Sequence, residues 1–430
     1  MVSNLGILVG GGPAPGINSV IGAATIRAIL QGVDVVGIHH GFEDIMRGVT
    51  DRARRLSVED VSRIHFTGGS ILGTSRANPT RDAKLLDAVV GSLEQLSVSQ
   101  LITIGGDDTA FSAMKVAERA GGRVRVVHVP KTIDNDLDLD PDVDTFGYQT
   151  ARHLGVELVQ NLMVDARTTG RWYLVIAMGR RAGHLALGIG KAAGATLTLI
   201  PEEFPEYRTT LAALVDTLVG AIIKRRAEGR SYGVAVLAEG LAECLPEGDL
   251  KAMGDVEYDD HGHVRFAEID VGTGLRKATA RRLADLGVKG TLVSKNIGYE
   301  LRCADPIPYD MEYTRDLGYC AAKYLLSGGD AAMVSLRAGH FVPIPFAQML
   351  DPQTGRTRVR MVDIESTRYA IARRYMIRLR RDDFADAAAV SRFAAIAHLT
   401  PEDFRQQFAY LVEHERPPLD LLHRDDGTPR

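Results

Sequence analysis

The feature that most constrains this chain is the strict alternation of short apolar runs with longer amphipathic segments. One amphipathic segment repeats apolar residues at helical spacing from Ile17 to Ala28, and another begins at Leu211. The apolar runs have no polar face, which is typical of strands buried in a parallel sheet. Alternating strands and helices predict parallel sheets joined by right-handed crossovers, an α/β fold. The predicted strands are Leu5 to Val9, Val33 to Ile38, Leu101 to Ile104, Val124 to Val129, Tyr173 to Ala177, Thr196 to Ile200 and Gly233 to Ala238.

The composition indicates two domains and excludes several classes of partner. The chain has 430 residues, of which 45% are hydrophobic, enough for two cores. The formal net charge is -4, so no global basic field would draw it to nucleic acid or anionic lipid. Because no basic leader or membrane-length apolar run is found, we expect a cytoplasmic protein with no membrane partner. Cys244, Cys303 and Cys320 show no metal-ligand spacing, and we expect reduced, buried thiols.

The loop after the first predicted strand, Gly10 to Gly16, is rich in glycine. Loops that follow strands carry the ligands in sheets of this kind. It is not a dinucleotide fingerprint, because Pro15 occupies the third glycine position, and Ile17 and Asn18 replace the Lys-Ser/Thr of a Walker A loop. What remains is a helix N-terminus whose exposed N–H groups suit an anion such as phosphate. The alternative is a tight turn without a ligand.

The loop after the third predicted strand reads Gly-Gly-Asp-Asp-Thr, from Gly105 to Thr109. It places two carboxylates, Asp107 and Asp108, beside a predicted helix start. One carboxylate can hold Mg²⁺ while the glycines let a phosphate approach the backbone. The alternative is that Asp108 or Thr109 merely caps a helix that covers Ala110 to Ala120.

The loop after the fourth predicted strand carries two further acids. Asp134 and Asp136 alternate on an extended segment, so both can face one ligand while Asn135 is turned aside. Lys131 and Thr132 add a cation and a hydroxyl next to them. A carboxylate kept ionised by a basic neighbour can accept a proton from a sugar hydroxyl, as phosphoryl transfer to an alcohol requires. The alternative is an Asx-turn with no ligand.

These three loops, in this order, resemble the phosphofructokinase family over roughly residues 5 to 330. The resemblance implies two Rossmann-like parallel-sheet domains of the phosphofructokinase type. The donor-binding domain would cover residues 1–145, completed by about 302–340, and the sugar-phosphate domain residues 146–301. Residues 341–430 would form a C-terminal extension, which we expect to be a helical cap or interface. The matching motifs are Gly-Gly-x-x-Pro-Gly-x-Asn at Gly11 to Asn18, the Gly-Gly-Asp loop, Thr-Ile-Asp-Asn-Asp at Thr132 to Asp136 and Met-Gly-Arg at Met178 to Arg180.

The resemblance also implies catalytic, metal and donor residues. Asp134 would take the proton of the sugar 1-hydroxyl, with Asp136, Thr132 and Lys131 beside it, and Asp107 would bind Mg²⁺. The residues implied for the donor phosphates are Gly11, Arg76, Asp108 and Lys131.

A second set of residues is implied for fructose 6-phosphate. Arg171 matches a position that in the family reaches the sugar phosphate of a neighbouring subunit, so we expect a homodimer or homotetramer. The implied residues are Thr132, Arg171, Met178, Gly179, Arg180, Glu239, Lys295, Tyr299 and Arg302.

Two positions favour pyrophosphate over ATP as the donor. ATP-using relatives resemble this chain but carry glycine where it has Asp108. A carboxylate there fills the space and repels the α-phosphate of a nucleotide, while Lys131 can balance Asp108 and bind pyrophosphate. The implied reaction is Mg-dependent, reversible phosphoryl transfer from pyrophosphate to fructose 6-phosphate. An ATP-dependent phosphofructokinase and a catalytically silent regulatory paralogue remain alternatives, and use of sedoheptulose 7-phosphate stays open.

Overall fold

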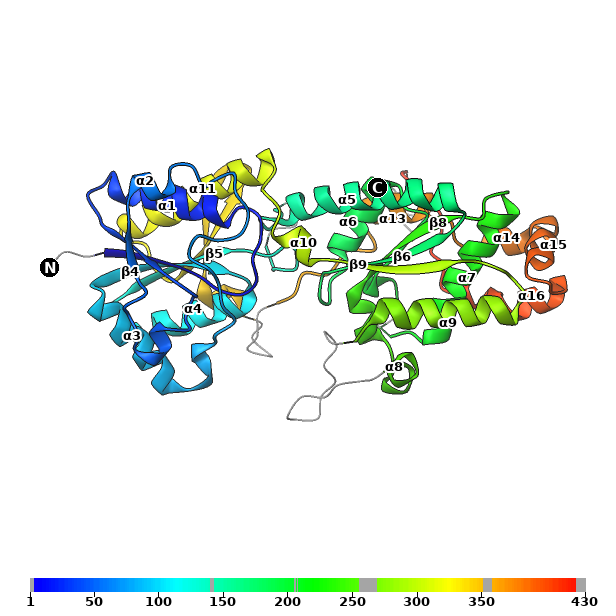
Figure 1. The fold of residues 1–430 in the computed structure, drawn as a ribbon, viewed down its shortest axis with the longest axis horizontal. Helices are drawn as coiled ribbons and strands as arrows, with labels where there is room; N and C mark the ends of the chain where they lie inside the picture. The colour runs from blue at the N-terminus through cyan, green and yellow to red at the C-terminus, as the bar shows by residue number, and fades with distance from the viewer. Residues whose placement is uncertain are drawn as a thin grey trace. The chain divides into compact units, whose positions relative to one another are not determined.

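The structure, a computed structural model, describes residues 4–139, 143–204, 206, 208–254, 269–350 and 358–422. The chain forms two compact units, and each consists of two separate segments. Unit 1 comprises Met1–Leu154 and Tyr299–Arg360, and unit 2 comprises Gly155–Gly298 and Met361–Arg430. Each unit has its own sheet, whose strands are labelled in Figure 1.

The sheet of unit 1, within the described residues, has five parallel strands between two antiparallel edge strands. Its order is β11-β10-β5-β4-β1-β2-β3. The first four predicted strands are confirmed as β1, β2, β4 and β5, whose apolar residues are buried because helices cover both faces of the sheet. The bounds are β1 (Asn4–Val9), β2 (Val35–Ile38), β3 (Arg54–Leu56), β4 (Val98–Gly105), β5 (Arg125–Pro130), β10 (Ala332–Arg337) and β11 (His340–Pro345).

Helices pack on both faces of the unit 1 sheet (Figure 1). α1 and α11 lie side by side on one face, and α3 and α4 lie on the other. The face of α1 that the spacing predicts, from Ile17 to Ala28, is fully buried. These helices are α1 (Ile17–Ile29), α3 (Ala83–Gln95), α4 (Asp107–Ala120) and α11 (Pro308–Leu326).

Unit 2 is built on a four-stranded parallel sheet of order β7-β8-β6-β9 among the described residues. The three remaining predicted strands are confirmed as β6, β7 and β8, but β9 was not predicted. Figure 1 shows α5 and α6 over one face of this sheet and α9 over the other. The bounds are β6 (Trp172–Ala177), β7 (Leu197–Leu199), β8 (Gly233–Ala238), β9 (Leu292–Ile297), α5 (Tyr148–Thr169), α6 (His184–Ala193), α7 (Leu211–Ala227) and α9 (Val271–Asp285).

The C-terminal part of the chain, from Met361 onward, belongs to unit 2. Its backbone contacts the sheet region at Thr196, whose carbonyl accepts from the Ile377 N–H at 2.8 Å. Phe404 and Phe408 are fully buried, with ring centroids 4.8 Å apart. The remaining residues of the expected extension, including β11 and α12 (Phe346–Met349), lie in unit 1. The helices from Met361 onward include α13 (Thr367–Tyr375), α14 (Arg381–Ala385), α15 (Ala387–Ile396) and α16 (Pro401–Phe408).

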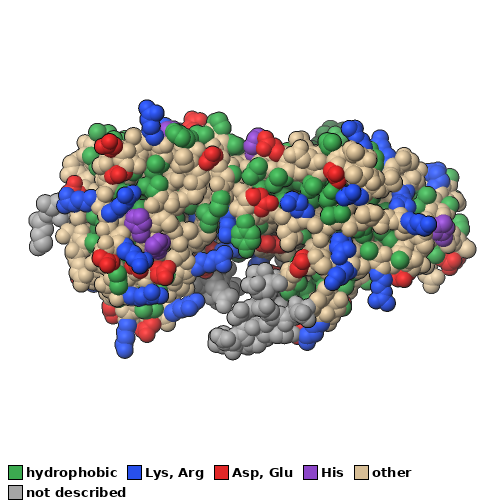
Figure 2. Space-filling view, viewed as in Figure 1, with side chains coloured by type: hydrophobic (Ala, Val, Ile, Leu, Met, Phe, Trp, Pro, Cys, Tyr) green, Lys and Arg blue, Asp and Glu red, His purple; other side chains and the backbone are tan. Residues whose placement is uncertain are grey.

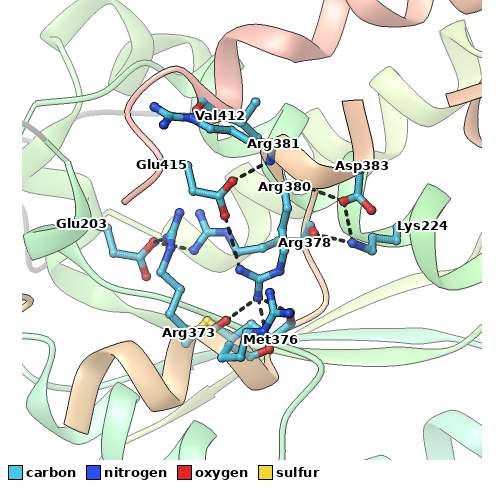
Figure 3. A network of polar contacts seen from close by, with 11 residues as sticks. Glu203, Lys224, Arg373, Met376, Arg378, Arg380, Arg381, Asp383, Val412 and Glu415 are labelled. Carbon is cyan, nitrogen blue, oxygen red and sulfur yellow. Dashed lines mark hydrogen bonds and ion pairs between the residues drawn. The ribbon is translucent and has the colours of Figure 1, made fainter. Parts of the chain in front are cut away.

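A network of buried ion pairs fixes the C-terminal helices to unit 2 (Figure 3). Glu203, whose side chain is 3% exposed, pairs with Arg373 at 3.1 Å and Arg378 at 2.7 Å. Arg380 pairs with Glu415 at 3.3 Å nearby. Removing one partner of a buried pair leaves the other charge without compensation, so these contacts hold the C-terminal segment in place.

Two expectations from composition can be compared with the structure. The cysteines are free thiols, but only Cys244 is buried; Cys320 is half-buried and Cys303 is exposed, so the expectation of buried thiols was wrong for these two. On the face drawn in Figure 2, acidic and basic side chains are interspersed over the surface. None of the helices in the described ranges is both long and apolar enough to cross a bilayer.

The Glu203 network gives a prediction about the stability of unit 2. Glu203→Gln is expected to lower the free energy of unfolding by about 3–5 kcal/mol, because two arginines lose their buried countercharge. The single tryptophan, Trp172, lies buried in β6 and reports on unit 2 alone, so urea unfolding followed by its fluorescence measures the effect. Glu365→Gln, which breaks an exposed pair with Arg416 within unit 2, is the control and is expected to cost less than about 1 kcal/mol. Equal midpoints for the two variants would contradict the prediction.

Candidate functional site

The glycine loop after β1 leads into α1 through Gly16. This residue is the N-cap of α1, and its φ of 103° is in the left-handed region that glycine adopts without strain. No side chain caps the helix there, so its first N–H groups face the loop. The Asn18 side chain folds back to hold the next loop, since its Nδ2 donates to Thr67 O at 3.1 Å and its Oδ1 accepts from Ile71 N at 2.9 Å. The motif therefore combines a helix N-terminus that no side chain caps with a residue, Asn18, that holds the next loop.

The Gly-Gly-Asp loop lies directly against the glycine loop. A methyl group added at Gly10 would come 2.4 Å from the Thr109 hydroxyl oxygen, so the two loops pack with no space for a side chain. Helix α4 begins at Asp107 with Gly106 as its N-cap. Capping by Asp108 or Thr109 is therefore wrong, because both residues lie inside the first turn. Asp107 is half-buried and Asp108 is exposed, and the positive end of the helix dipole stabilises both carboxylates.

Lys131 connects the loop after β5 to the glycine loop. Its side chain is buried, and its Nζ donates to the Gly12 carbonyl. Its backbone N–H donates to the Gly105 carbonyl at 2.8 Å. A methyl group at Gly11 would lie 3.4 Å from the Lys131 ammonium. The structure therefore brings a buried cation to the open end of α1.

The buried imidazole of His128 contacts the same Gly105 carbonyl that accepts from the Lys131 N–H. His128 Nε2 lies 2.9 Å from the Gly105 carbonyl, and Nδ1 lies 2.8 Å from the Thr103 hydroxyl. The carbonyl can only accept, so Nε2 carries the proton and Nδ1 accepts from the threonine. The pKa of His128 is lowered to about 3, chiefly by burial and to a smaller extent by the charge of Lys131, while the hydrogen bond to Gly105 acts in the opposite direction. The ring is therefore neutral at physiological pH.

The Thr-Ile-Asp-Asn-Asp segment is buried and tightly bonded to its own unit. The Asp134 N–H donates to the Thr132 hydroxyl at 3.0 Å, so a turn is present beside the acids. Asn135, with φ of 58°, donates to Asp144 at 2.9 Å, while its side-chain oxygen accepts from Thr145 N, also at 2.9 Å. Its side chain is thus held by the fold. Asp134 and Asp136 flank it at 7% and 9% exposure.

Arg360 holds the same segment from a distant part of the sequence. Its backbone N–H donates to the Asp136 carbonyl at 2.8 Å, and its Nε donates to the Asn135 carbonyl at 3.1 Å. A second guanidinium nitrogen donates to the Val143 carbonyl at 2.8 Å. Arg360 was not predicted, since no local pattern marks it as a neighbour of these acids.

The other predicted residues of unit 1 lie around the glycine loop. The Gly11 N–H donates to the Ser75 carbonyl at 2.8 Å, which places the exposed Arg76 one residue beyond this contact. Arg302, predicted for the sugar phosphate, has its Nη1 3.1 Å from where a methyl group at Gly12 would be. Its guanidinium lies 4.6 Å from the centre of the Tyr299 ring, which is 72% exposed. Both are carried by α10 (Tyr299–Arg302).

The predicted residues of unit 2 follow the carboxyl ends of adjacent strands. Ala177, the last residue of β6, pairs in register with Ala238 of β8 and Ile297 of β9, so Met178 and Glu239 emerge at one edge of the sheet. Lys295 is exposed on β9, an edge strand.

Glu239 also holds the Met-Gly-Arg loop. One oxygen of Glu239 accepts from the Gly179 N–H at 3.1 Å and from the Arg180 N–H at 2.6 Å. Arg171, at the other end of β6, pairs with Asp165 at 3.8 Å. The structure therefore groups Met178, Gly179, Arg180 and Glu239, and leaves Arg171 apart from them.

The carboxylates were tested for a protein-built metal site. Within the described ranges, no group of three or more His, Cys, Asp or Glu side chains is arranged to hold a metal ion. Mg²⁺ is usually bound by one or two carboxylates together with the phosphate oxygens of a substrate. Asp107, half-buried at a helix N-terminus, could supply such a single carboxylate, with the phosphate oxygens of a substrate as the other ligands.

Comparison with known proteins agrees with this geometry. The family model for phosphofructokinase matches residues 4–325, which is most of the chain. The chain belongs to the phosphofructokinase family. A relative from Thermotoga maritima, named pyrophosphate–fructose 6-phosphate 1-phosphotransferase, is 52% identical over 418 residues, which cover 96% of this chain and 100% of the relative. A relative of the same name from Naegleria fowleri is 50% identical over 421 residues and 96% of each chain.

Solved phosphofructokinase structures share the fold. A pyrophosphate-dependent phosphofructokinase from Marinobacter aquaeolei superimposes with a TM-score of 0.65 at 17% identity, over 100% of this chain and 95% of the other. Yeast phosphofructokinase gives the same TM-score of 0.65 at 19% identity, and there 95% of this chain spans only 50% of the yeast chain. The predicted fold class, two Rossmann-like domains with a helical C-terminal part, is confirmed.

The buried imidazole gives a prediction about pH. The unfolded chain takes up a proton near the ordinary pKa of 6.5, whereas folded His128 does so only near about 3. The contribution of neutral His128 to the free energy of unfolding is complete above pH 6.5. It is lost by about 1.4 kcal/mol per pH unit as the pH falls from 6.5 towards the folded pKa of about 3. In His128→Gln the free energy of unfolding should therefore depend less steeply on pH between 6.5 and 4, as measured by urea unfolding followed by circular dichroism. His340→Gln, at an exposed position of β11, should keep the wild-type slope; a wild-type slope in both variants would contradict the prediction.

Proposed function

We propose that this chain transfers a phosphoryl group from pyrophosphate to the 1-hydroxyl of fructose 6-phosphate, giving fructose 1,6-bisphosphate and phosphate. The observation that carries the proposal is its identity of 52% and 50%, over nearly its whole length, to two proteins named for this reaction. The phosphoryl group moves between two phosphate compounds of similar transfer potential, so the reaction runs in both directions.

The donor choice depends on Asp108 and Lys131. A nucleotide would have to bring its α-phosphate past the carboxylate in the first turn of α4, where two negative charges at short distance repel each other. Pyrophosphate has no adenylyl part to pass this point. The Lys131 ammonium, held at the Gly12 carbonyl, supplies a positive charge beside the glycine loop. Gly11 and Arg76 would complete the donor contacts, and Arg76 would neutralise charge on the group in transfer.

The acids after β5 supply the base. In the forward direction the sugar O1 forms a bond to one phosphorus of pyrophosphate, the bridging P–O bond breaks, and phosphate leaves. Asp134 would accept the O1 proton, with Asp136, Thr132 and Lys131 beside it. The buried position of Asp134 and the bonds that Asn135 and Arg360 make around it support this role, because a base must be held in one orientation. Asp107 would hold Mg²⁺, which when bound neutralises charge on the phosphate oxygens.

Fructose 6-phosphate would bind to the residues implied by the family. Met178, Gly179 and Arg180 would line its site, and Glu239 would accept hydrogen bonds from its hydroxyls while holding the loop. Lysine, arginine and tyrosine side chains can donate charge-assisted hydrogen bonds to the 6-phosphate of the sugar. The residues proposed for them are Lys295, Tyr299, Arg302 and Arg171.

Arg171 would act on the sugar phosphate of a neighbouring subunit, so a homodimer or homotetramer is part of the proposal. A cytoplasmic location remains a prediction from the sequence. From the family resemblance we also propose that unit 1 binds the donor and that unit 2 carries most of the sugar-phosphate site.

The proposal is tested by an assay with Mg²⁺, fructose 6-phosphate and either donor. We expect turnover with pyrophosphate and none with ATP. Asp134→Asn should lower kcat by at least about a thousandfold while sugar-phosphate binding persists, because only the proton acceptor is lost. Asp138→Asn, at an exposed acid paired with Arg358 at 3.6 Å, is the matched control and should stay close to wild type. Turnover with ATP alone would overturn the donor assignment, and full activity of Asp134→Asn would remove its role as base.

The donor choice gives a separate prediction. Asp108→Gly should raise kcat/KM for ATP by about tenfold or more, because it removes the charge and the side chain that oppose the α-phosphate. The same change should lower kcat/KM for pyrophosphate. The measurement is the ratio of the two kcat/KM values in variant and wild type. A ratio that does not move towards ATP would show that other parts of the donor site exclude the nucleotide.

A further inference from the structure

The loop Met178–Gly183 is held at both ends by glutamate side chains. At its start, Glu239 accepts from the N–H groups of Gly179 and Arg180 at 3.1 and 2.6 Å. At its end, Glu202 Oε1 accepts from the Gly183 N–H at 2.8 Å. Glu202 lies in the turn η3 (Pro201–Glu203), which follows β7. Two carboxylates from different strand ends thus fix one loop.

The loop has a backbone conformation that requires such support. Arg180 has φ of 48°, in the left-handed region that non-glycine residues adopt only when their surroundings hold them there. The packing is close on both sides of the loop. A methyl group at Gly183 would lie 2.6 Å from Glu202 Oε2, and one at Gly240 would lie 2.3 Å from the Arg180 carbonyl oxygen. The loop is therefore packed closely against Glu202 on one side and Gly240 on the other.

The oxygen that holds Gly183 has a second donor. Glu202 Oε1 also accepts from the Val362 N–H at 2.9 Å, and Val362 lies at the start of the C-terminal part of unit 2. Glu202 is 4% exposed. Burial raises the pKa of its carboxyl, and the two backbone hydrogen bonds act in the opposite direction. A single buried oxygen thus joins the loop to the C-terminal segment.

We propose that Glu202 is a positioning residue for the sugar phosphate: it fixes the Met178–Gly183 loop and makes the C-terminal segment part of the support of that loop. The inference builds on the proposed function, in which Gly179 and Arg180 contact fructose 6-phosphate. Glu202 itself touches no substrate in this proposal. It acts through the backbone of the loop, and its loss would let Gly179 and Arg180 move from the position in which they bind.

Glu202→Ala removes the acceptor for both N–H groups, and Glu202→Gln keeps one carbonyl acceptor of nearly the same size. We expect KM for fructose 6-phosphate to rise by about tenfold or more in the alanine variant. KM for pyrophosphate should stay within about twofold of the wild-type value, because the residues proposed for the donor lie in unit 1 and the loop lies in unit 2. The glutamine variant should recover part of the loss.

The matched control is Glu203→Gln. Glu203 is the next residue and its side chain is 3% exposed, but its carboxylate contacts Arg373 and Arg378 and not the loop. All assays are made well below the unfolding midpoint of each variant, as read from Trp172 fluorescence. Glu203→Gln should keep the wild-type KM for fructose 6-phosphate. A purely structural role of Glu202 would make its variants behave like this control, and that result would overturn the inference.

Hydrogen exchange of the ligand-free protein supplies a readout that does not depend on turnover. The peptide that covers residues 178–186 should exchange faster in Glu202→Ala than in wild type or Glu203→Gln. The peptide that covers residues 361–366 should exchange faster in Glu202→Ala than in wild type. Unchanged exchange, or an equal rise of KM for both substrates, would also overturn the inference. If the wild-type protein neither binds fructose 6-phosphate nor turns it over, the proposed function itself fails. Wild-type turnover with an unaltered KM in Glu202→Ala refutes the positioning role alone.

Discussion

The buried ammonium of Lys131 is the interaction on which the arrangement of unit 1 depends. A buried charge is tolerated only where it is hydrogen-bonded and compensated, and this one donates to the Gly12 carbonyl between the loops that follow β1 and β5. Its backbone is fixed by the Gly105 carbonyl, which His128 also holds. These contacts hold the ammonium in one position in the ligand-free protein. A charge held in this way can stabilise a bound anion without a rearrangement of the surrounding protein.

The sequence predicted most strands of both sheets, but the interior strand β10 and the edge strands β3, β9 and β11 were not predicted. The seven predicted runs, which are apolar almost throughout, all became strands, because burial on both faces leaves a nearly continuous apolar signal. Strand β9 was missed, since Leu-Val-Ser-Lys-Asn-Ile is polar at its centre and lies at the edge of its sheet with Lys295 exposed. The start of α4 was placed three residues late, because two adjacent acids look like a cap when they in fact form the first turn.

Part of the candidate site could be predicted because its residues follow strands in short motifs. The glycine loop, the acids after β5 and the Met-Gly-Arg loop are local in sequence and share strand ends in the fold. The residues that hold them are not local. Arg360 bonds to Asn135 across a separation of 225 residues, and Glu202 reaches Val362 across 160. His128 is one polar residue in an apolar strand, and nothing in its neighbourhood reveals its partner.

The division of the chain has a consequence for synthesis. The backbone passes from one unit to the other at 154/155, 298/299 and 360/361, so neither unit is a continuous stretch. Strand β10, which completes the parallel part of the first sheet beside β5, leaves the ribosome only after all four strands of the second sheet. At about 5–20 residues per second, the edge of β5 waits roughly ten seconds or more without its neighbour. An unpaired edge of buried apolar sequence can pair wrongly, so the risk of misassembly is greatest in the interval between the synthesis of β5 and that of β10.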